Sequence, residues 1–117
     1  MIDGLLLHDL AHARPVRTPF IEIERQVAAR HGVSVAEHRG PCRARRVAWP
    51  RQELMWRARR ETRLSLPQIG ERLGGRDHTT VIHGVRAHQD RLDRARDLAV
   101  RAARDQARRA AVQGGRP

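Results

Sequence analysis

Apolar residues recur at helical spacing through most of the chain, and no stretch alternates between apolar and polar residues with a period of two. An apolar stripe that starts at Phe20 predicts a helix with Thr18 as its N-cap, and Gly32 ends that helix. The run Ser34-Val35-Ala36-Glu37 has the capping-box pattern and predicts a short helix that ends near Gly40. We therefore predict an all-α fold with no sheet.

A longer helix is predicted over residues 45–63. Pro50 cannot lie deep inside a helix without a kink, so the pattern indicates a true start nearer Val47. One face of this helix is apolar and carries Val47, Leu54, Ala58 and Thr62. The opposite face is basic and carries Arg51, Arg57, Arg59 and Arg60.

Two further helical patterns flank the pair Gly74-Gly75, which favours a tight turn because glycine adopts positive φ without steric cost. The first pattern, residues 65–73, opens with another capping box, Ser65-Leu66-Pro67-Gln68. The second has Asp77 as its N-cap, short polar side chains on its first turn and an apolar stripe behind them. This layout is typical of a helix-turn-helix, whose recognition helix we predict over about residues 78–91.

The helical pattern continues from Leu92 to Val112 with only a thin apolar stripe. No glycine or proline separates this stretch from the recognition helix, so the sequence by itself allows one long helix. We divide the chain into an N-terminal extension of uncertain order, a helical domain and a loose tail, over residues 1–17, 18–112 and 113–117.

The charge of the chain makes nucleic acid the first partner to consider. All 24 basic residues are arginine, 13 residues are acidic, and the net charge is +11. A GC-rich genome is the simplest reason for arginine over lysine, but it does not explain the positive excess. Three aromatic residues, Phe20, Trp49 and Trp56, are too few for a base-stacking platform, so duplex DNA is favoured over single strands. The basic loop at residues 40–46 holds three arginines in its last four residues. It is either a solvated charge run or a minor-groove arm or phosphate clamp.

Other functional classes find little support. The single cysteine, Cys42, is consistent with a reducing compartment. The chain has no apolar run long enough to span a membrane and no basic secretory signal at its start. We therefore expect a cytoplasmic protein with no membrane partner. His8 and His12 have a spacing that can bind metal on a helix, but no third ligand stands near them, and a frayed or docking helix is the favoured interpretation. No paired carboxylates and no nucleophile with its base stand out, so we predict neither an enzyme nor a cofactor.

The segment G-G-R-D-H-T-T-V-I-H at residues 74–83 resembles the signature of the C-terminal DNA-binding domain of the bacterial replication initiator DnaA. V-A-W-P-R-Q at residues 47–52 is similar to that family's V-A-R-P-R-Q, and S-L-P-Q-I-G at residues 65–70 is similar to its S-L-P-E-I-G. The resemblance covers roughly residues 20–111. It implies a compact helical domain with a break in the last helix between about residues 90 and 95.

The resemblance also implies roles for single residues. It implies that Asp77, His78 and Thr79 read bases, that Thr80 contacts a phosphate and that Arg43 enters the adjacent minor groove. It implies phosphate contacts from Arg51, from Gln52 and from the helix start at Leu66-Pro67. Arg45 of the basic loop and Arg76 of the turn complete the candidate DNA-binding set.

Plainer alternatives stay open for three of these residues. Asp77 could be only a helix cap, Thr80 could bond only within its turn, and His78 could be an ordinary surface histidine. We expect His83, further along the helix, to pack against the core.

The chain departs from the family pattern at several points. Trp49 stands where the family usually has arginine, which implies the loss of one phosphate contact. Gly84 lowers the stability of the recognition helix by up to about 1 kcal/mol relative to alanine. The chain has no G-x-x-x-x-G-K-[ST] loop and no lysine, so we expect no nucleotide binding and a stand-alone DNA-reading domain without the ATPase module.

These observations favour a sequence-specific double-stranded DNA-binding protein that regulates transcription or replication. Two alternatives remain open. One is a non-specific architectural DNA-binding protein, suggested by the net charge. The other is an interaction module for replication proteins, suggested by Leu5-Leu6-Leu7 in the N-terminal extension.

Overall fold

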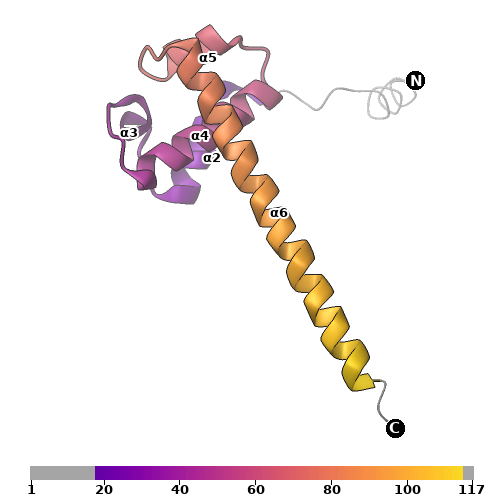
Figure 1. Ribbon diagram of the computed structural model, residues 1–117. Helices are drawn as coiled ribbons and strands as arrows, with labels where there is room; N and C mark the ends of the chain where they lie inside the picture. The colour runs from indigo at the N-terminus through magenta and orange to yellow at the C-terminus, as the bar shows by residue number, and fades with distance from the viewer. Residues whose placement is uncertain (1–17, 115–117) are drawn as a thin grey trace, which may run out of the picture.

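The computed structural model describes residues 18–114, and within this range it is helical with no strand. The elements are α2, α3, α4, α5 and α6, which span Phe20–His31, Val35–Arg39, Arg45–Glu61, Leu66–Arg72 and His78–Gly114 (Figure 1). The all-α prediction is confirmed for this part of the chain. The sequence predictions for Leu5-Leu6-Leu7 and for a metal at His8 and His12 fall on residues 1–17, outside the described residues.

Local signals set most of the helix ends. Gly32 ends α2 in the left-handed conformation (φ 65°), as predicted, but Pro19 rather than Thr18 is the N-cap of that helix. The capping box of α3 is present, since the Glu37 N–H donates to Ser34 Oγ at 3.1 Å and the Ser34 N–H donates to Glu37 Oε1 at 3.2 Å. The equivalent box of α5, between Ser65 and Gln68, is also present. These predicted ends are therefore confirmed apart from a shift of one residue at Thr18.

The helix α4 begins at Arg45 and not nearer Val47, so the prediction drawn from Pro50 is wrong. Pro50 lies in the second turn, where its missing N–H removes a single intrahelical hydrogen bond, and its ring is buried. The helix ends at Glu61 because the Thr62 hydroxyl donates to the Ala58 carbonyl and accepts the Leu64 N–H, at 3.2 Å in the latter case.

The helix α4 lies at the centre of the domain and packs against α2, α3, α5 and α6. The core comprises fully or almost fully buried apolar side chains from four helices: Phe20, Ile23, Val27, Leu54, Met55, Ala58, Ile69, Leu73 and Val81. Burial of each larger aliphatic side chain contributes about 1.5–3 kcal/mol. The predicted stripe of α4 is confirmed at Val47, Leu54 and Ala58, whereas Thr62 is only partly buried.

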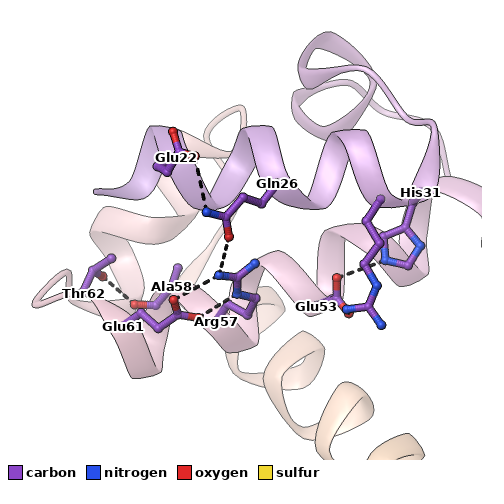
Figure 2. A network of polar contacts seen from close by, with 9 residues as sticks. Glu22, Gln26, His31, Glu53, Arg57, Ala58, Glu61 and Thr62 are labelled. Carbon is purple, nitrogen blue, oxygen red and sulfur yellow. Dashed lines mark hydrogen bonds and ion pairs between the residues drawn. The ribbon is translucent and has the colours of Figure 1, made fainter. Parts of the chain in front are cut away.

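Polar contacts fix α2 to α4 along their shared edge (Figure 2). Arg57 donates to Gln26 Oε1 at 2.7 Å and pairs with Glu61 at 2.6 Å. At the other end of α2, the ring of His31 lies 3.0 Å from the carboxylate of the nearly buried Glu53. These contacts orient two helices whose apolar faces alone would permit sliding.

Gly84 marks the closest approach of α6 to α4. A Cβ at this position would overlap the sulfur of Met55, so glycine is the residue that lets the two helices pack at this distance. The loss of helix propensity at Gly84 is thus offset by a tertiary contact that the sequence pattern did not indicate.

The last helix, α6, is continuous over 37 residues, so the break expected between residues 90 and 95 is wrong. Its sequence contains no proline, and most residues after Leu92 are alanine, arginine and other good helix formers. Residues 92–114, here called the α6 arm, are all exposed and project away from the other helices (Figure 1). The helix also includes Gln113 and Gly114, which the sequence had placed in a loose tail. None of the helices within residues 18–114 is both long and apolar enough to cross a membrane.

Gly70 provides a test of the packing of α5 against the turn before α6. A Cβ on Gly70 would overlap the backbone carbonyl of Arg76, whose N–H donates to the Gly70 carbonyl at 2.8 Å. We expect Gly70→Ala to lower the free energy of unfolding by about 1–3 kcal/mol in urea titration, although alanine is the better helix former. Glu71→Ala, at the exposed neighbouring position, should change it by less than about 0.5 kcal/mol. A Gly70→Ala variant at least as stable as the parent would contradict this packing.

Two histidines are buried in the bundle. His38 is fully buried, and neither of its ring nitrogens has a hydrogen-bond partner among the described residues. The ring of His88 packs against that of Trp56 with 5.1 Å between centroids. Burial lowers the pKa of both imidazoles, because it disfavours the charged form.

This burial predicts a loss of stability on acidification. Below the unfolded pKa of about 6.5, the unfolded chain binds protons that the folded chain does not, at up to about 1.4 kcal/mol per pH unit for each histidine. Stability should be full above about pH 7 and should fall as the pH drops towards 5. In urea titrations at several pH values, His38→Leu should make this fall shallower than that of the parent protein. Identical pH profiles for His38→Leu and the parent would contradict the prediction.

Candidate nucleic-acid interface

The first turn of α6 is a polar, exposed surface. The side chains of Asp77, His78, Thr79 and Thr80 are exposed, whereas Val81 directly behind them is fully buried. The helix is therefore buried at Val81, Gly84 and His88 and presents its first turn to solvent, as predicted for residues 78–91. His83, one turn further along, is exposed, so the prediction that it packs against the core is wrong. Position 83 lies off the stripe formed by Val81, Gly84 and His88.

Asp77 organises this turn. Its carboxylate accepts a hydrogen bond from the Thr79 hydroxyl and lies 3.1 Å from His78 Nδ1. The pKa of Asp77 is lowered, chiefly by the Thr79 hydroxyl and also by the charge of His78 and by the backbone N–H groups of Thr79 and His78. Asp77 directly precedes α6 and its backbone carbonyl accepts the Val81 N–H at 3.2 Å, which is the position of an N-cap. The Asp77 carboxylate also keeps a negative charge beside the start of the helix.

Arg51 does not lie on a solvated face. It is only 6% exposed, and its guanidinium donates to four backbone carbonyls: those of His38 at 2.8 Å, Cys42 at 3.0 Å, Glu37 at 3.1 Å and Gly40 at 3.2 Å. Burial lowers the pKa of Arg51, and the nearby charge of Arg76 lowers it further. The family resemblance implied a phosphate contact for Arg51, but its guanidinium is directed to the backbone of residues 37–42.

Arg76 has a similar environment. Its guanidinium is partly buried and donates to the carbonyls of Leu73, Gly40 and His38, the last at 3.3 Å. Burial lowers the pKa of Arg76 as well. Arg51 and Arg76 together therefore bind the carbonyls of one segment, residues 37–42, from α4 and from the turn before α6. We call this pair the carbonyl clamp.

The three arginines of the basic loop follow the segment that the carbonyl clamp holds, and two of them, Arg45 and Arg46, are the first residues of α4. Arg43 and Arg45 are exposed, and Arg46 pairs with Glu37 at 2.9 Å. The guanidinium of Arg45 lies 5.6 Å from the centre of the Trp49 ring. The sequence had indicated basic residues here but not the clamp that fixes the loop beside the turn before α6.

The remaining candidates lie in the middle of α4 and at the start of α5. Gln52 is partly buried on α4 next to Gly84 of α6, and its Oε1 atom is buried without a partner among the described residues. At the start of α5, Ser65 takes the N–H groups of Gln68 and Ile69, and Pro67 has none. The N–H of Leu66 is thus the group of this turn best suited to an external acceptor.

Comparison with known sequences identifies the family to which the chain belongs. The model of a family described as the bacterial dnaA protein helix-turn-helix matches residues 21–87. The chain belongs to this bacterial DnaA helix-turn-helix family. The match includes α2 to α5 and the start of α6, so it contains both the carbonyl clamp and the first turn of α6.

Individual relatives agree with this assignment. The chain is 45% identical over 80 residues to the chromosomal replication initiator protein DnaA of Cereibacter sphaeroides, a match that covers 68% of this chain and 18% of that protein. It is 44% identical over 89 residues to the DnaA of Brucella abortus, with 76% and 18% covered. It is 43% identical over 106 residues to the DnaA of Thermomicrobium roseum, with 86% and 23% covered. The chain thus matches about a fifth of the length of these DnaA relatives.

The carbonyl clamp yields a prediction for stability. Arg51→Ala removes several charge-assisted hydrogen bonds and leaves carbonyl groups without a partner, so it should lower the free energy of unfolding by about 3 kcal/mol. Arg59→Ala is the matched control, because Arg59 lies on the same helix but is exposed, and it should cost less than about 0.5 kcal/mol. The measurement is urea unfolding followed by circular dichroism. Equal stability of the two variants would show that the clamp contributes little.

Proposed function

We propose that this protein binds double-stranded DNA sequence-specifically and acts as a regulator of replication or transcription at sites resembling the DnaA box. The observation that supports this most is the polar first turn of α6, residues 77–80, which is exposed beside a basic loop held in place by the carbonyl clamp. The relatives are replication initiators, which agrees with a role on chromosomal DNA in the cytoplasm.

Each part of this surface has a proposed role. The first turn of α6 enters the major groove, where Asp77 can accept from cytosine, His78 can donate to a base or phosphate, and the methyl group of Thr79 can contact thymine. The hydroxyl of Thr79 already bonds to Asp77, which leaves the methyl group as its free contact. Thr80 contacts a phosphate at the edge of the groove.

The flanking contacts fix the position of the helix on the duplex. Arg43 enters the adjacent minor groove, and Arg45, Gln52 and the start of α5 at Leu66 and Pro67 contact the phosphate backbone. We assign Arg51 and Arg76 an indirect role, since their guanidinium groups are engaged with backbone carbonyls. They support DNA binding by holding the loop that carries Arg43.

A non-specific architectural DNA-binding protein is the second candidate, favoured by the net charge of +11 and by the exposed arginines of the α6 arm. The two candidate functions predict different degrees of discrimination between DNA sequences. A base-reading helix predicts a large difference in affinity between a preferred and a scrambled duplex, whereas phosphate contacts alone predict almost none.

The test starts from a preferred site selected from a random duplex pool. Thr79→Ala should weaken binding to this site by about 1–3 kcal/mol and flatten discrimination at one base position, while binding to a scrambled duplex stays nearly unchanged. With about six to eight phosphates neutralised, the logarithm of the association constant should fall against the logarithm of salt concentration with a slope of about −5 to −7.

The control for this titration is Arg59→Ala, a surface substitution on α4 that removes one charge without touching the first turn of α6. It should affect all duplexes alike. If selection yields no preferred site, or if Thr79→Ala weakens preferred, mismatched and scrambled duplexes equally, the architectural alternative is favoured.

A further inference from the structure

Trp49 is a large aromatic side chain that remains 46% exposed on the second turn of α4. Two guanidinium groups lie against its ring: that of Arg45, one turn earlier on α4, at 5.6 Å from the ring centre, and that of Arg91, on α6, at 4.7 Å. Both distances are within the range of cation–π attraction. The indole therefore joins an exposed arginine at the start of α4 to an arginine of the recognition helix.

Arg91 is the more buried of the two arginines. It is partly buried, its Nη2 atom is enclosed without a hydrogen-bond partner among the described residues, and burial lowers its pKa. It lines a cavity of about 330 Å³ together with Trp49, Glu53 and His88. Arg91 follows His78 by 13 positions, or about 20 Å along the helix axis, so it lies well behind the turn that faces DNA.

Arg45 is the more exposed of the two arginines that contact Trp49. Its side chain is exposed at the first position of α4, next to the loop that the carbonyl clamp holds. An unsupported arginine at such a position samples many rotamers and loses that freedom when it binds a phosphate. Contact with a fixed ring restricts those rotamers before DNA arrives, which reduces the entropic cost of the contact.

We propose that Trp49 is a positioning residue for DNA binding, which holds the guanidinium of Arg45 in place for a backbone phosphate through a ring that Arg91 anchors to α6. This inference rests on the proposed function. Position 49 is arginine in the family pattern, where it would contact a phosphate directly. In this chain, Trp49 would instead support the phosphate contact of the neighbouring Arg45.

A double-mutant cycle tests the proposal, with the full chain and the selected duplex. Trp49→Ala and Arg45→Ala should each lower affinity about two- to five-fold, and the double variant should bind about as tightly as Arg45→Ala alone. Trp49→Phe keeps an aromatic ring and should restore most of the affinity. The salt slope should fall by about one for Arg45→Ala, and Trp49→Ala should produce no further fall in the Arg45→Ala background.

Trp56 and Arg60 form the matched control pair on the same helix. Arg60 lies 4.7 Å from the Trp56 ring and is far from the basic loop in sequence, so Arg60→Ala should reduce affinity less than Arg45→Ala does. The positioning role is overturned if Trp49→Ala weakens binding equally with and without Arg45, or if it has no effect. A parent protein that binds no duplex would instead defeat the proposed function itself, and this inference with it.

Discussion

The arrangement of the candidate interface depends on two guanidinium groups, that of the buried Arg51 and that of the partly buried Arg76. Within residues 37–42, Arg51 donates to four backbone carbonyls and Arg76 to two. Removing a guanidinium from water is costly, and charge-assisted hydrogen bonds to several carbonyls offset that cost. The C-terminal end of α3 and the irregular residues that follow it are thereby held against α4 and the turn before α6. This contact also fixes the position of the backbone at the exposed arginines that follow, Arg43 and Arg45.

The carbonyl clamp also couples the loop to the recognition helix. Arg76 lies in the turn between α5 and α6, so the residue that binds the Gly40 carbonyl is nearly adjacent to Asp77 and His78. Two close approaches tighten the same region: Gly70 against the backbone of Arg76, and Gly74, at φ 82°, against the backbone of Arg39. The spacing between the basic loop and the first turn of α6, the two parts of the proposed DNA-binding surface, is therefore set by contacts within the protein.

Much of this fold could be predicted from the sequence, because the signals were local. Both capping boxes, the glycine that ends α2 and the turn before α6 are confirmed, and the family resemblance is confirmed by the match over residues 21–87. The directions of Arg51 and Arg76 could not be predicted. Periodicity separates polar from apolar positions, and an arginine satisfied by carbonyls has the same pattern as one satisfied by water.

Other errors have equally physical causes. The sequence alone allowed α6 to be continuous, and only the family resemblance implied a break. The helix continues through residues 90–95 because alanine and arginine have high helix propensity. Gly84 looked unfavourable because its contact with Met55 comes from another helix. The site roles of Asp77, His78, Thr79 and Thr80 remain predictions. The structure places these residues together on an exposed turn and supports a capping role for Asp77.

The central claim is that the first turn of α6 and the clamped loop form one DNA-binding surface. The most direct test is to follow the backbone amide resonances of the ¹⁵N-labelled protein by NMR during titration with the selected duplex. The largest changes should fall on residues 43–46, 65–67 and 76–80, with little change along the α6 arm. Changes concentrated on residues 92–114, with the turn at 76–80 unaffected, would contradict the claim.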